Sequence, residues 1–336
     1  MIRLSGFADE IGPDLGLQIQ TLAGENIRFL ELRGVSGKNV LDFTAAERQD
    51  IRKRLGDAGI GVSAIGSPIG KVRVDESWPA HVERFKIALD TAEFFGAPYI
   101  RIFSYYPPQG GRIAEHRQEV IRRLNEQMAM AKGRKAQLLH EDEKDIYGEK
   151  TAECLDIAKS VAGMKLIFDP ANFVQVGVKP GEAWPVLRDH VVYFHIKDAL
   201  LADGKVVPPG EGDGDIEAVL RDALINRKYD GFLSMEPHLA VAGQFQGFSG
   251  PDLFKKATQC LKKMLDRLGV KLQERHVGRF ERRVFRAPSV RSGSCRQAAH
   301  ACRPNDMTPT LRSGLDLASL RQSRFHRLDQ RVVNGH

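Results

Sequence analysis

The 336-residue sequence contains little cysteine and no long apolar run. Its four cysteines show neither a CxxC pair nor regular spacing, which gives no support to a structural zinc site or a disulfide framework. No window approaches the roughly 20 uninterrupted apolar residues that would span a bilayer. The first ten residues, MIRLSGFADE, carry an acidic pair where a signal peptide needs an apolar core. These absences predict a cytoplasmic protein with no membrane partner.

The sequence also lacks the glycine motifs that bind nucleotides. There is no GxGxxG after the first candidate strand and no GxxxxGK[ST] anywhere. The glycine-rich run at residues 210–214, GEGDG, has a different pattern, and its acids would repel phosphate. We predict that this run is a loop that leads to Asp215 as a helix N-cap.

The net charge of +7 comes from one end of the chain. Residues 275–336 contain 13 Arg, no Lys and four acids, whereas residues 1–274 carry 37 basic and 39 acidic side chains. The tail mixes Arg with Ser, Pro and Gly and shows no sustained apolar periodicity. We therefore predict a folded domain at 1–274 and a disordered basic C-terminal extension at 275–336. An arm for RNA is the alternative for the tail, although sequence carried past the natural end of the domain explains the abrupt change better. The slightly acidic body predicts no nucleic-acid partner.

The body alternates short aliphatic runs with segments of helical spacing. The candidate strands are 2–7, 29–33, 61–65, 99–103, 137–140, 165–169, 191–196 and 231–236. The helical patterns are 14–24, 45–58, 81–95, 114–131, 150–162, 181–188, 216–226 and 252–268. Eight βα units in this length predict an α/β fold, a (β/α)8 TIM barrel with parallel strands.

Polar residues end the last four candidate strands. They are Glu141 in LLHED, Asp169 in LIFDP, His195 in VVYFHIKD and Glu236 in LSMEP. A single acid at a strand end is usually a helix cap or a solvated charge, but four polar ends on consecutive strands would converge at the barrel mouth. Three carboxylates there would repel one another without a cation. The mixed N/O set predicts one divalent metal ion, Mn²⁺ by preference, with Mg²⁺, Co²⁺ or Zn²⁺ as alternatives.

The strand ends HED, FDP, FHIKD and MEPH, with SPIGK after the third strand and GEGDGD after the seventh, resemble the xylose-isomerase-like TIM barrel superfamily. Within it, they resemble the sugar phosphate isomerase/epimerase family, over about residues 1–270. The resemblance implies that Glu141, Asp169, His195 and Glu236 hold the metal, and that Glu141 and Glu236 are the catalytic proton-transfer pair. Barrels of this kind are often homodimers.

The activity implied is isomerisation or epimerisation of a sugar or sugar phosphate, by proton transfer through a metal-stabilised enediolate. A proton returned to the neighbouring carbon isomerises the sugar, and one returned to the other face epimerises it. Asn172 stands where many epimerases of the superfamily have histidine. An amide can hydrogen-bond a substrate hydroxyl but cannot shuttle a proton, so the reaction stays open.

Four other residues are candidates for substrate binding. Lys197 and His238 each follow a metal ligand by two residues, which places them on the same side of an extended chain; either could instead be a salt-bridged rim residue. Lys71 in SPIGK and Arg101 near the end of the fourth strand are cations for a substrate carboxylate or phosphate, although a loop lysine is usually solvated.

Three further side chains have predicted orientations. Glu31 and Arg33 alternate in FLELR, so both are expected to face the barrel mouth as an internal ion pair. His140 precedes Glu141 and is expected to face away from it.

Three rival functions share the predicted fold. A lyase such as an inosose dehydratase-like enzyme would use the same metal and base. An abasic-site endonuclease would need three zinc ions and histidines at the ends of the second to fourth strands, which the sequence lacks. A non-catalytic sugar-binding barrel would be free to lose its ligands, yet all four are present.

Overall fold

The computed structural model describes residues 2–242 and 247–272. The predicted domain boundary at 274 and the disorder predicted for residues 275–336 lie outside the described residues. Within them, no helix has the length and apolar character needed to cross a membrane.

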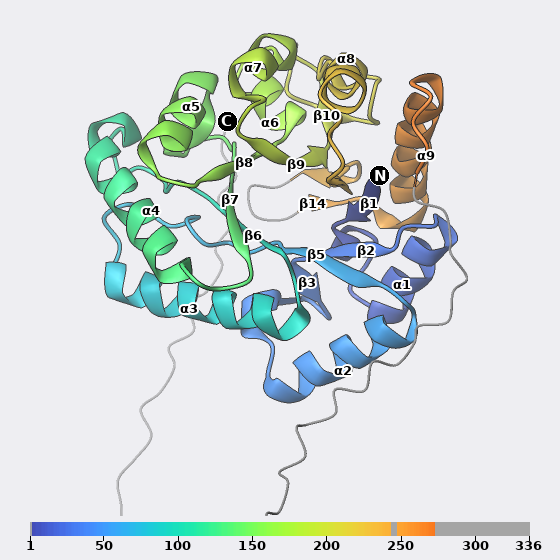
Figure 1. Ribbon diagram of the computed structural model, residues 1–336, viewed down its shortest axis with the longest axis horizontal. Helices are drawn as coiled ribbons and strands as arrows, with labels where there is room; N and C mark the ends of the chain where they lie inside the picture. Colours follow the sequence, from blue (N-terminus) through green and yellow to red (C-terminus); the bar gives the residue numbers. More distant parts are fainter. Residues whose placement is uncertain (1, 243–246, 273–336) are drawn as a thin grey trace, which may run out of the picture. The chain divides into compact units, whose positions relative to one another are not determined.

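The centre of the fold is one sheet of eight parallel strands (Figure 1), in the order β1-β12-β9-β8-β7-β6-β5-β2. A parallel bridge between Phe7 and Glu31 continues from β1 to β2 and closes the sheet into a barrel. The predicted TIM barrel is therefore confirmed. The strands are β1 (Arg3–Gly6), β2 (Phe29–Leu32), β5 (Gly61–Ile65), β6 (Tyr99–Ile102), β7 (Gln137–Glu141), β8 (Lys165–Phe168), β9 (Val191–Ile196) and β12 (Phe232–Met235).

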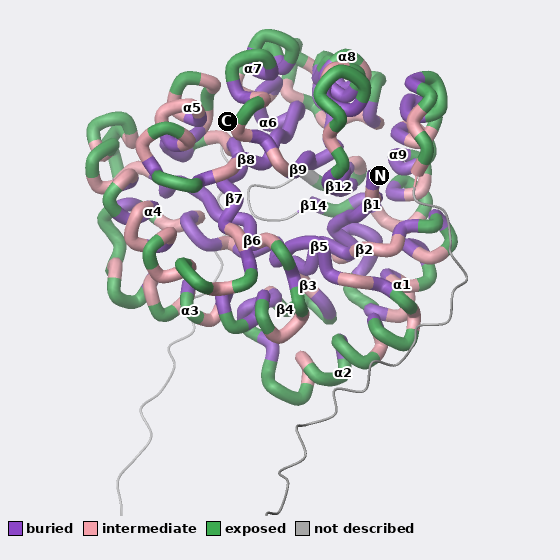
Figure 2. The backbone as a smooth tube through the Cα atoms, in the orientation of Figure 1, coloured by how far each residue is buried: buried purple, intermediate pink, exposed green. Residues whose placement is uncertain are grey.

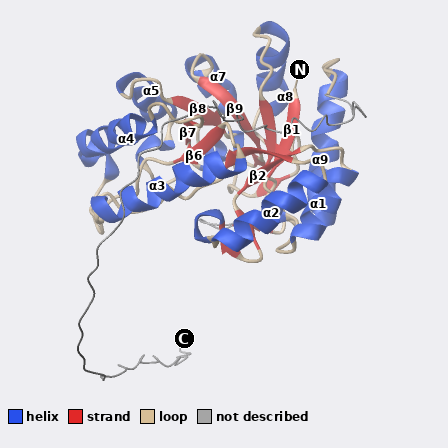
Figure 3. Ribbon diagram, turned by 60° about the horizontal axis from the view of Figure 1, so that its bottom comes forward, coloured by secondary structure: helices blue, strands red, loops and turns tan. Residues whose placement is uncertain are grey.

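Helices surround the strands (Figure 3) and bury the outer face of the sheet (Figure 2). A side chain caps the N-terminus of several of them; at α2, Thr44 and Glu47 form a complete capping box. Each predicted helical segment contains a helix, and a short helix that was not predicted, α6, follows β8. The helices are α1 (Leu15–Gly24), α2 (Ala45–Asp57), α3 (Trp78–Phe95), α4 (Arg117–Ala131), α5 (Thr151–Ser160), α6 (Pro170–Gln175), α7 (Pro180–Leu187), α8 (Ile216–Leu220) and α9 (Gly250–Arg267).

Three two-residue hairpins follow strands of the barrel at their carboxyl ends. They come after β2, β9 and β12, so they lie at the end of the barrel where parallel strands of this fold carry the active site. Their strands are β3 (Gly34–Val35) and β4 (Lys38–Asn39), β10 (Asp198–Ala199) and β11 (Val206–Val207), and β13 (Val241–Ala242) and β14 (Gly247–Phe248).

The inside of the barrel changes from apolar to polar along the strands. The apolar level is a buried cluster of Ala64, Leu139, Ile167, Tyr193 and Phe232. Because side chains alternate along a strand, the residues two positions further on point the same way. These residues include Glu141, Asp169 and His195, so the strand period places the polar side chains on top of a packed apolar floor.

The SPIGK loop is fixed to the loop after β6 by backbone hydrogen bonds. The amide of Phe103 donates to the carbonyl of Ile69 at 2.8 Å, and that of Tyr105 donates to Gly70 at 3.0 Å. Gly70 has a φ of +90°, and a Cβ there would lie 2.1 Å from the carbonyl oxygen of Phe103. Only glycine fits this position, and the close approach fixes one wall of the barrel mouth.

His140 faces away from the barrel interior, as predicted, and is buried against Gly148. Neither ring nitrogen has a hydrogen-bond partner. Burial lowers the pKa of His140 to about 3 from its ordinary 6.5, so the folded state holds this ring neutral.

A His140→Leu variant should therefore lose acid sensitivity. In the wild-type protein the unfolded state takes up a proton on His140 below pH 6.5 and the folded state does not, so stability is full above 6.5 and falls as the pH drops. Between pH 6.5 and about pH 4, the free energy of unfolding of the wild type should fall by about 3 kcal/mol relative to the variant. Urea unfolding at both pH values measures this difference, and a difference that does not change with pH would contradict the assignment.

Candidate metal centre

Four side chains meet at the carboxyl ends of neighbouring barrel strands. Glu141 ends β7, Asp169 follows β8, His195 lies in β9 and Glu236 follows β12. One ligand atom from each residue lies within 4.8 Å of the other three. All four residues are buried, with at most 2% of their surface exposed. The structure thus brings together the four residues that the sequence predicted as metal ligands.

The imidazole of His195 lies between two sets of carboxylates. Its Nδ1 atom is 2.9 Å from Glu141 Oε1, 3.1 Å from Glu236 Oε2 and 3.9 Å from Asp169 Oδ2. Its Nε2 atom lies 3.2 Å from Glu31 Oε2 on the other side. Nδ1 is therefore the nitrogen that faces the other three candidate ligands, and Glu31 orients the ring from behind.

Hydroxyl groups inside the barrel hold the Glu31 carboxylate in place. The hydroxyls of Tyr193 and Ser234 donate to Glu31 Oε2 at 3.0 and 2.7 Å. The Ser63 hydroxyl in turn lies 2.9 Å from that of Tyr193. This chain of hydrogen bonds runs through the barrel interior and fixes the position of the carboxylate behind His195.

Local structure also aims Asp169 at the centre. Asp169 is the N-cap of α6, and its Oδ1 atom accepts the amides of Ala171 and Asn172 at 2.9 and 3.2 Å. Pro170 occupies the first turn, where its fixed φ suits a helix start. With Oδ1 occupied by the cap, Oδ2 is the oxygen that faces the other candidate ligands.

The electrostatics of the cluster favour the charged forms of Glu141 and His195 but not of Asp169. Burial alone would raise the pKa of Glu141, but His195 and Arg101 outweigh it and lower the pKa to about 2. Burial alone would lower the pKa of His195, yet Glu141, Glu31 and Glu236 raise it well above its ordinary value. Burial raises the pKa of Asp169 to about 7, against the opposing effect of Lys197. Without a metal, a protonated His195 offsets the carboxylate charge together with Arg101 and Lys197.

The residues present fit a divalent cation. Asp169 Oδ2 and Glu236 Oε2 are buried without a well-aligned hydrogen bond; Lys197 Nζ lies 2.8 and 3.6 Å from them, and His195 Nδ1 lies 3.1 Å from Glu236 Oε2. Buried carboxylate oxygens in this state are the kind of ligand that Mn²⁺ and Mg²⁺ prefer, and one imidazole nitrogen completes the set. A cation would take the place of the Nδ1 proton of His195, as metal binding to histidine requires.

Four of the five residues predicted to bind substrate lie beside the cluster. Arg101 Nη1 is 3.0 Å from Glu141 and 3.6 Å from Glu236. Lys197 pairs with Asp169, and His238 Nε2 lies 3.4 Å from Glu236 Oε1. Asn172 Nδ2 donates to the carbonyl of Asp142 at 2.7 Å and lies 3.3 Å from Glu141 Oε1. Each of these side chains thus touches a candidate metal ligand.

The fifth residue, Lys71, pairs with an acid outside the set of four ligands. Its ammonium lies 2.8 Å from Glu143 Oε2 and over the ring of Phe103, at the wall built by the SPIGK loop. The Lys71 ammonium thus lies at the side of the barrel mouth, and not at the bottom of the mouth with the four candidate ligands.

The predicted ion pair between Glu31 and Arg33 is wrong. Glu31 lies at the depth of His195 and pairs with it. Arg33 lies two residues further along the chain and reaches Asp9 at 2.7 Å and Glu236 at 3.2 Å. Both face the barrel interior, as expected from their alternation. Their partners differ because the two residues lie at different heights along the barrel axis, opposite different residues of the other strands.

The glycine-rich run after β9 binds an internal carboxylate. Asp198 accepts backbone amides from Gly210, Gly212 and Gly214 at 2.7, 3.1 and 2.8 Å, and from Ala199 at 2.9 Å. The run is a loop, as predicted, and sequence analysis missed Asp198. The signal was the acid directly after Lys197 in HIKDA, with glycines at every second position 12 to 16 residues later.

The predicted capping role of Asp215 is wrong. Asp215 precedes α8 at the N-cap position, but it has a left-handed backbone with φ of 51°, and its side chain makes no cap hydrogen bond. The carboxylate instead accepts the amide of Gly181 in α7 at 3.2 Å. It therefore ties two helices together.

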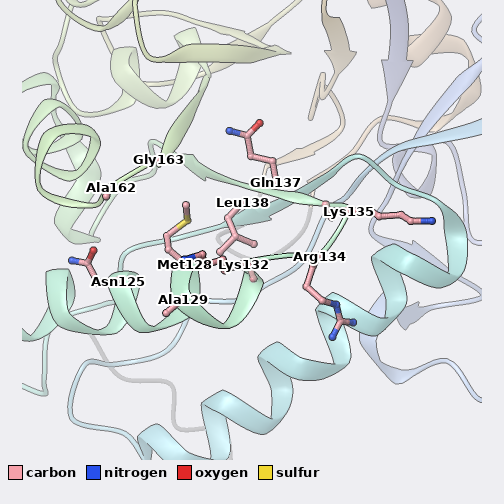
Figure 4. Close-up of a pocket in the computed structure, with 12 residues that line it drawn as sticks. Asn125, Met128, Ala129, Lys132, Arg134, Lys135, Gln137, Leu138, Ala162 and Gly163 are labelled. Atoms are coloured by element: carbon pink, nitrogen blue, oxygen red, sulfur yellow. The ribbon is translucent and has the colours of Figure 1, made fainter.

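A pocket of about 480 Å³ lies away from this chemistry (Figure 4). It is lined by the end of α4, the loop before β7 and the start of β7 at Gln137, whereas Glu141 lies at the other end of that strand. No acid, histidine or cysteine is among its lining residues. The pocket therefore lacks the carboxylate and imidazole groups that would hold a divalent metal ion.

A Glu31→Gln variant is expected to bind Mn²⁺ more weakly. The amide keeps the shape of the side chain but removes the charge that fixes His195 with Nδ1 towards the cluster. Loss of such a supporting carboxylate typically costs 10- to 100-fold in metal affinity. Titration with Mn²⁺, followed by electron paramagnetic resonance of the free ion, measures the change. Glu211→Gln, on an exposed loop, is the matched control; equal affinities in both variants would contradict this role of Glu31.

Comparisons with known proteins bear on the family. The model of a family described as xylose isomerase-like TIM barrel matches residues 21–264. No curated protein matches the chain.

Solved structures share the fold at low sequence identity. A D-tagatose 3-epimerase-like protein is 15% identical, with a TM-score of 0.65, over 80% of this chain and 98% of that one. The probable 3-DHS dehydratase of petrobactin synthesis from Bacillus anthracis is 16% identical, with a TM-score of 0.63, over 77% and 98%. A xylose isomerase-like TIM barrel protein from Mycobacterium smegmatis, in complex with magnesium, is 17% identical, with a TM-score of 0.60, over 80% and 97%.

Proposed function

The chain belongs to the xylose isomerase-like TIM barrel family, and from this membership we propose that it is a divalent-metal-dependent isomerase or epimerase of sugars or sugar phosphates. The observation that carries the proposal is the convergence of Glu141, Asp169, His195 and Glu236, whose ligand atoms lie within 4.8 Å of one another on a buried barrel floor. We assign these four residues as the ligands of one ion, with Mn²⁺ as the preferred metal.

A bound divalent ion would polarise the carbonyl of a ketose or aldose and so acidify the adjacent C–H group. Glu141 and Glu236 are assigned the proton transfers, one as base and one as acid. Arg101 contacts both carboxylates, and the charges of His195 and Arg101 lower the pKa of Glu141, so that this side chain is ionised. Burial of all these groups excludes water from the proton being moved.

The cationic and amide groups at the rim are assigned to the substrate hydroxyls. Lys197, Asn172 and His238 each carry a donor beside a candidate ligand. Lys71 lies further out with Glu143 and would meet a substrate group at that wall of the mouth. A D-tagatose 3-epimerase-like protein among the structural neighbours agrees with a small carbohydrate substrate.

A dehydratase is the second candidate, and Lys197 is the observation that favours it. Its ammonium lies 2.8 Å from Asp169 and 3.6 Å from Glu236, where it could protonate a leaving hydroxyl after the same C–H proton is removed. Asn172 cannot shuttle a proton back to the other face of the substrate. A structural neighbour is a probable dehydratase. Product analysis separates the two reactions, because dehydration yields a product lighter by one water.

The test is metal content together with proton exchange. Elemental mass spectrometry of the full chain, before and after chelation, should find about one divalent ion per chain after reloading with Mn²⁺. The loaded protein should then incorporate deuterium from D2O at one C–H position of a ketose, and the chelated protein should not.

Two results would overturn the proposal. No metal after reloading with Mn²⁺ would mean that the four-residue cluster is not a metal site. One ion per chain without deuterium incorporation or water loss in any ketose, aldose or sugar phosphate would leave a binding protein instead of an enzyme.

A further inference from the structure

A second pocket, of about 350 Å³, adjoins the metal centre at Arg33. It is lined by the turn after β1, the β3–β4 hairpin and β14, and its polar and aromatic side chains include Asp9, Asn39 and Phe248. Its volume is within the range of pockets that hold small molecules, about 300 to 1,000 Å³. The proposed isomerase chemistry does not use this pocket.

Arg33 is the wall shared by the pocket and the metal centre. Its Nη1 atom lies 3.2 Å from Glu236 Oε1, while its Nε atom donates to Asp9 Oδ2 at 2.7 Å. One edge of this buried guanidinium thus meets a candidate catalytic carboxylate, and another edge meets Asp9, which lines the pocket. A molecule whose reacting carbons lie at Glu236 would have its distal part near the pocket if it were longer than one sugar.

Phe248 supplies an apolar surface in the pocket. It is 38% exposed, unlike Phe7 and Phe103 at the barrel mouth, which are fully buried. Backbone pairing with Val241 and the hydrogen bond from the Ala240 amide to the Phe248 carbonyl hold it in place. The C–H face of a sugar ring packs well on such an aromatic face.

The polar groups of the pocket favour hydroxyl groups over anions. Each of its cations already has an acidic partner: Arg33 pairs with Asp9 and Glu236, and Lys38 pairs with Glu47 at 2.6 Å. The remaining charge in the lining is the Asp9 carboxylate, whose Oδ1 atom is buried and accepts no hydrogen bond. A phosphate or carboxylate would meet this carboxylate and be repelled.

We propose that this pocket is a second subsite, which takes a neutral, hydroxylated ring joined to the sugar that reacts at the metal centre. The inference rests on the proposed function and deepens it: the substrate class is a two-ring glycoside of a keto sugar, not a free monosaccharide or a sugar phosphate. Phe248 packs on the distal ring, and the Asp9 carboxylate at the pocket wall disfavours an anionic group in its place.

The test compares binding of one-ring and two-ring ketoses. The Mn²⁺-loaded full chain is titrated calorimetrically with D-fructose, with its galactoside lactulose, with its glucoside isomaltulose and with fructose 6-phosphate. At least one disaccharide is expected to bind tenfold or more tightly than fructose. In Phe248→Ala this advantage should fall at least fivefold, while the affinity for fructose stays the same.

Leu253→Ala is the matched control, because Leu253 on α9 is also an exposed apolar side chain, 37% exposed, and does not line the pocket. It should leave the affinities for all four compounds unchanged. Equal binding of fructose and both disaccharides would overturn the subsite, as would a loss in Phe248→Ala that is the same for fructose. Tightest binding of fructose 6-phosphate, unaffected by Phe248→Ala, would replace it with an anion site.

Failure of the subsite is distinguishable from failure of the proposed function. Deuterium exchange into fructose with no preference for the disaccharides would leave the isomerase proposal standing and remove the subsite. A disaccharide preference that depends on Phe248, without deuterium exchange in any compound, would keep the subsite as a binding site and remove the isomerase.

Discussion

A Glu236→Gln variant loaded with Mn²⁺ is expected to exchange substrate C–H protons with solvent roughly 10² to 10⁴ times more slowly than the wild-type protein, and Glu141→Gln should do the same. The amide preserves the size of the side chain and its contact with Arg101, but it cannot accept the proton. Deuterium incorporation from D2O, followed by NMR at saturating Mn²⁺, measures the rate. Saturating metal ensures that a weaker ligand does not imitate the loss of a base.

Glu211→Gln is the control for a lost carboxylate, since Glu211 is exposed and lies on the loop after β9. Its rate should equal that of the wild type, and the thermal unfolding of all three variants should stay close to it. Full exchange activity in both Glu141→Gln and Glu236→Gln would refute the assigned proton-transfer roles, because another residue would then have to remove the C–H proton of the substrate.

The second large effect is expected for His195→Ala, which should retain well under one Mn²⁺ per chain after dialysis. The substitution removes the only nitrogen ligand of the proposed four. It also leaves Glu141, Glu31 and Glu236 without the imidazole that neutralises them when no metal is bound. Elemental mass spectrometry measures the metal, and circular dichroism checks that the barrel has folded.

His190→Ala serves as the matched histidine control, because His190 is half-buried and immediately precedes β9. It should bind metal as the wild type does. Stoichiometric Mn²⁺ in a folded His195→Ala protein would mean that the nitrogen is not needed, and that the carboxylates alone form the site.

The barrel and the convergence of four polar side chains at its mouth could be predicted because both depend on local patterns. Strand and helix alternate with clear apolar spacing, and in parallel strands the residue at the carboxyl end is placed at the mouth whatever its neighbours are. The positions of Glu141 and Glu236 could therefore be predicted without knowing the contacts between strands. The same rule correctly placed Arg101 and Lys197 beside them.

The partners of the other polar side chains could not be predicted, since they depend on the level at which neighbouring strands meet. Glu31 and Arg33 are two residues apart on one strand, yet one lies behind His195 and the other above Glu236. Sequence alternation gives the side of the sheet but not this depth. Helix α6 was missed for a different reason: six residues are too few for a helical period, and its capping residue, Asp169, was assigned to the metal alone.

The four backbone amides that bind the Asp198 carboxylate affect which substrates the barrel mouth can bind. Successive backbone amides that point into one hollow are a receptor for anions in many phosphate-binding proteins. Here four backbone amides already donate to one carboxylate of the chain itself, that of Asp198. The amides of the loop after β9 thus already have an acceptor within the chain, and they are not available to a phosphate group of a substrate. The glycine-rich run, whose own acids already disfavour phosphate, thus stabilises the barrel mouth from within the chain.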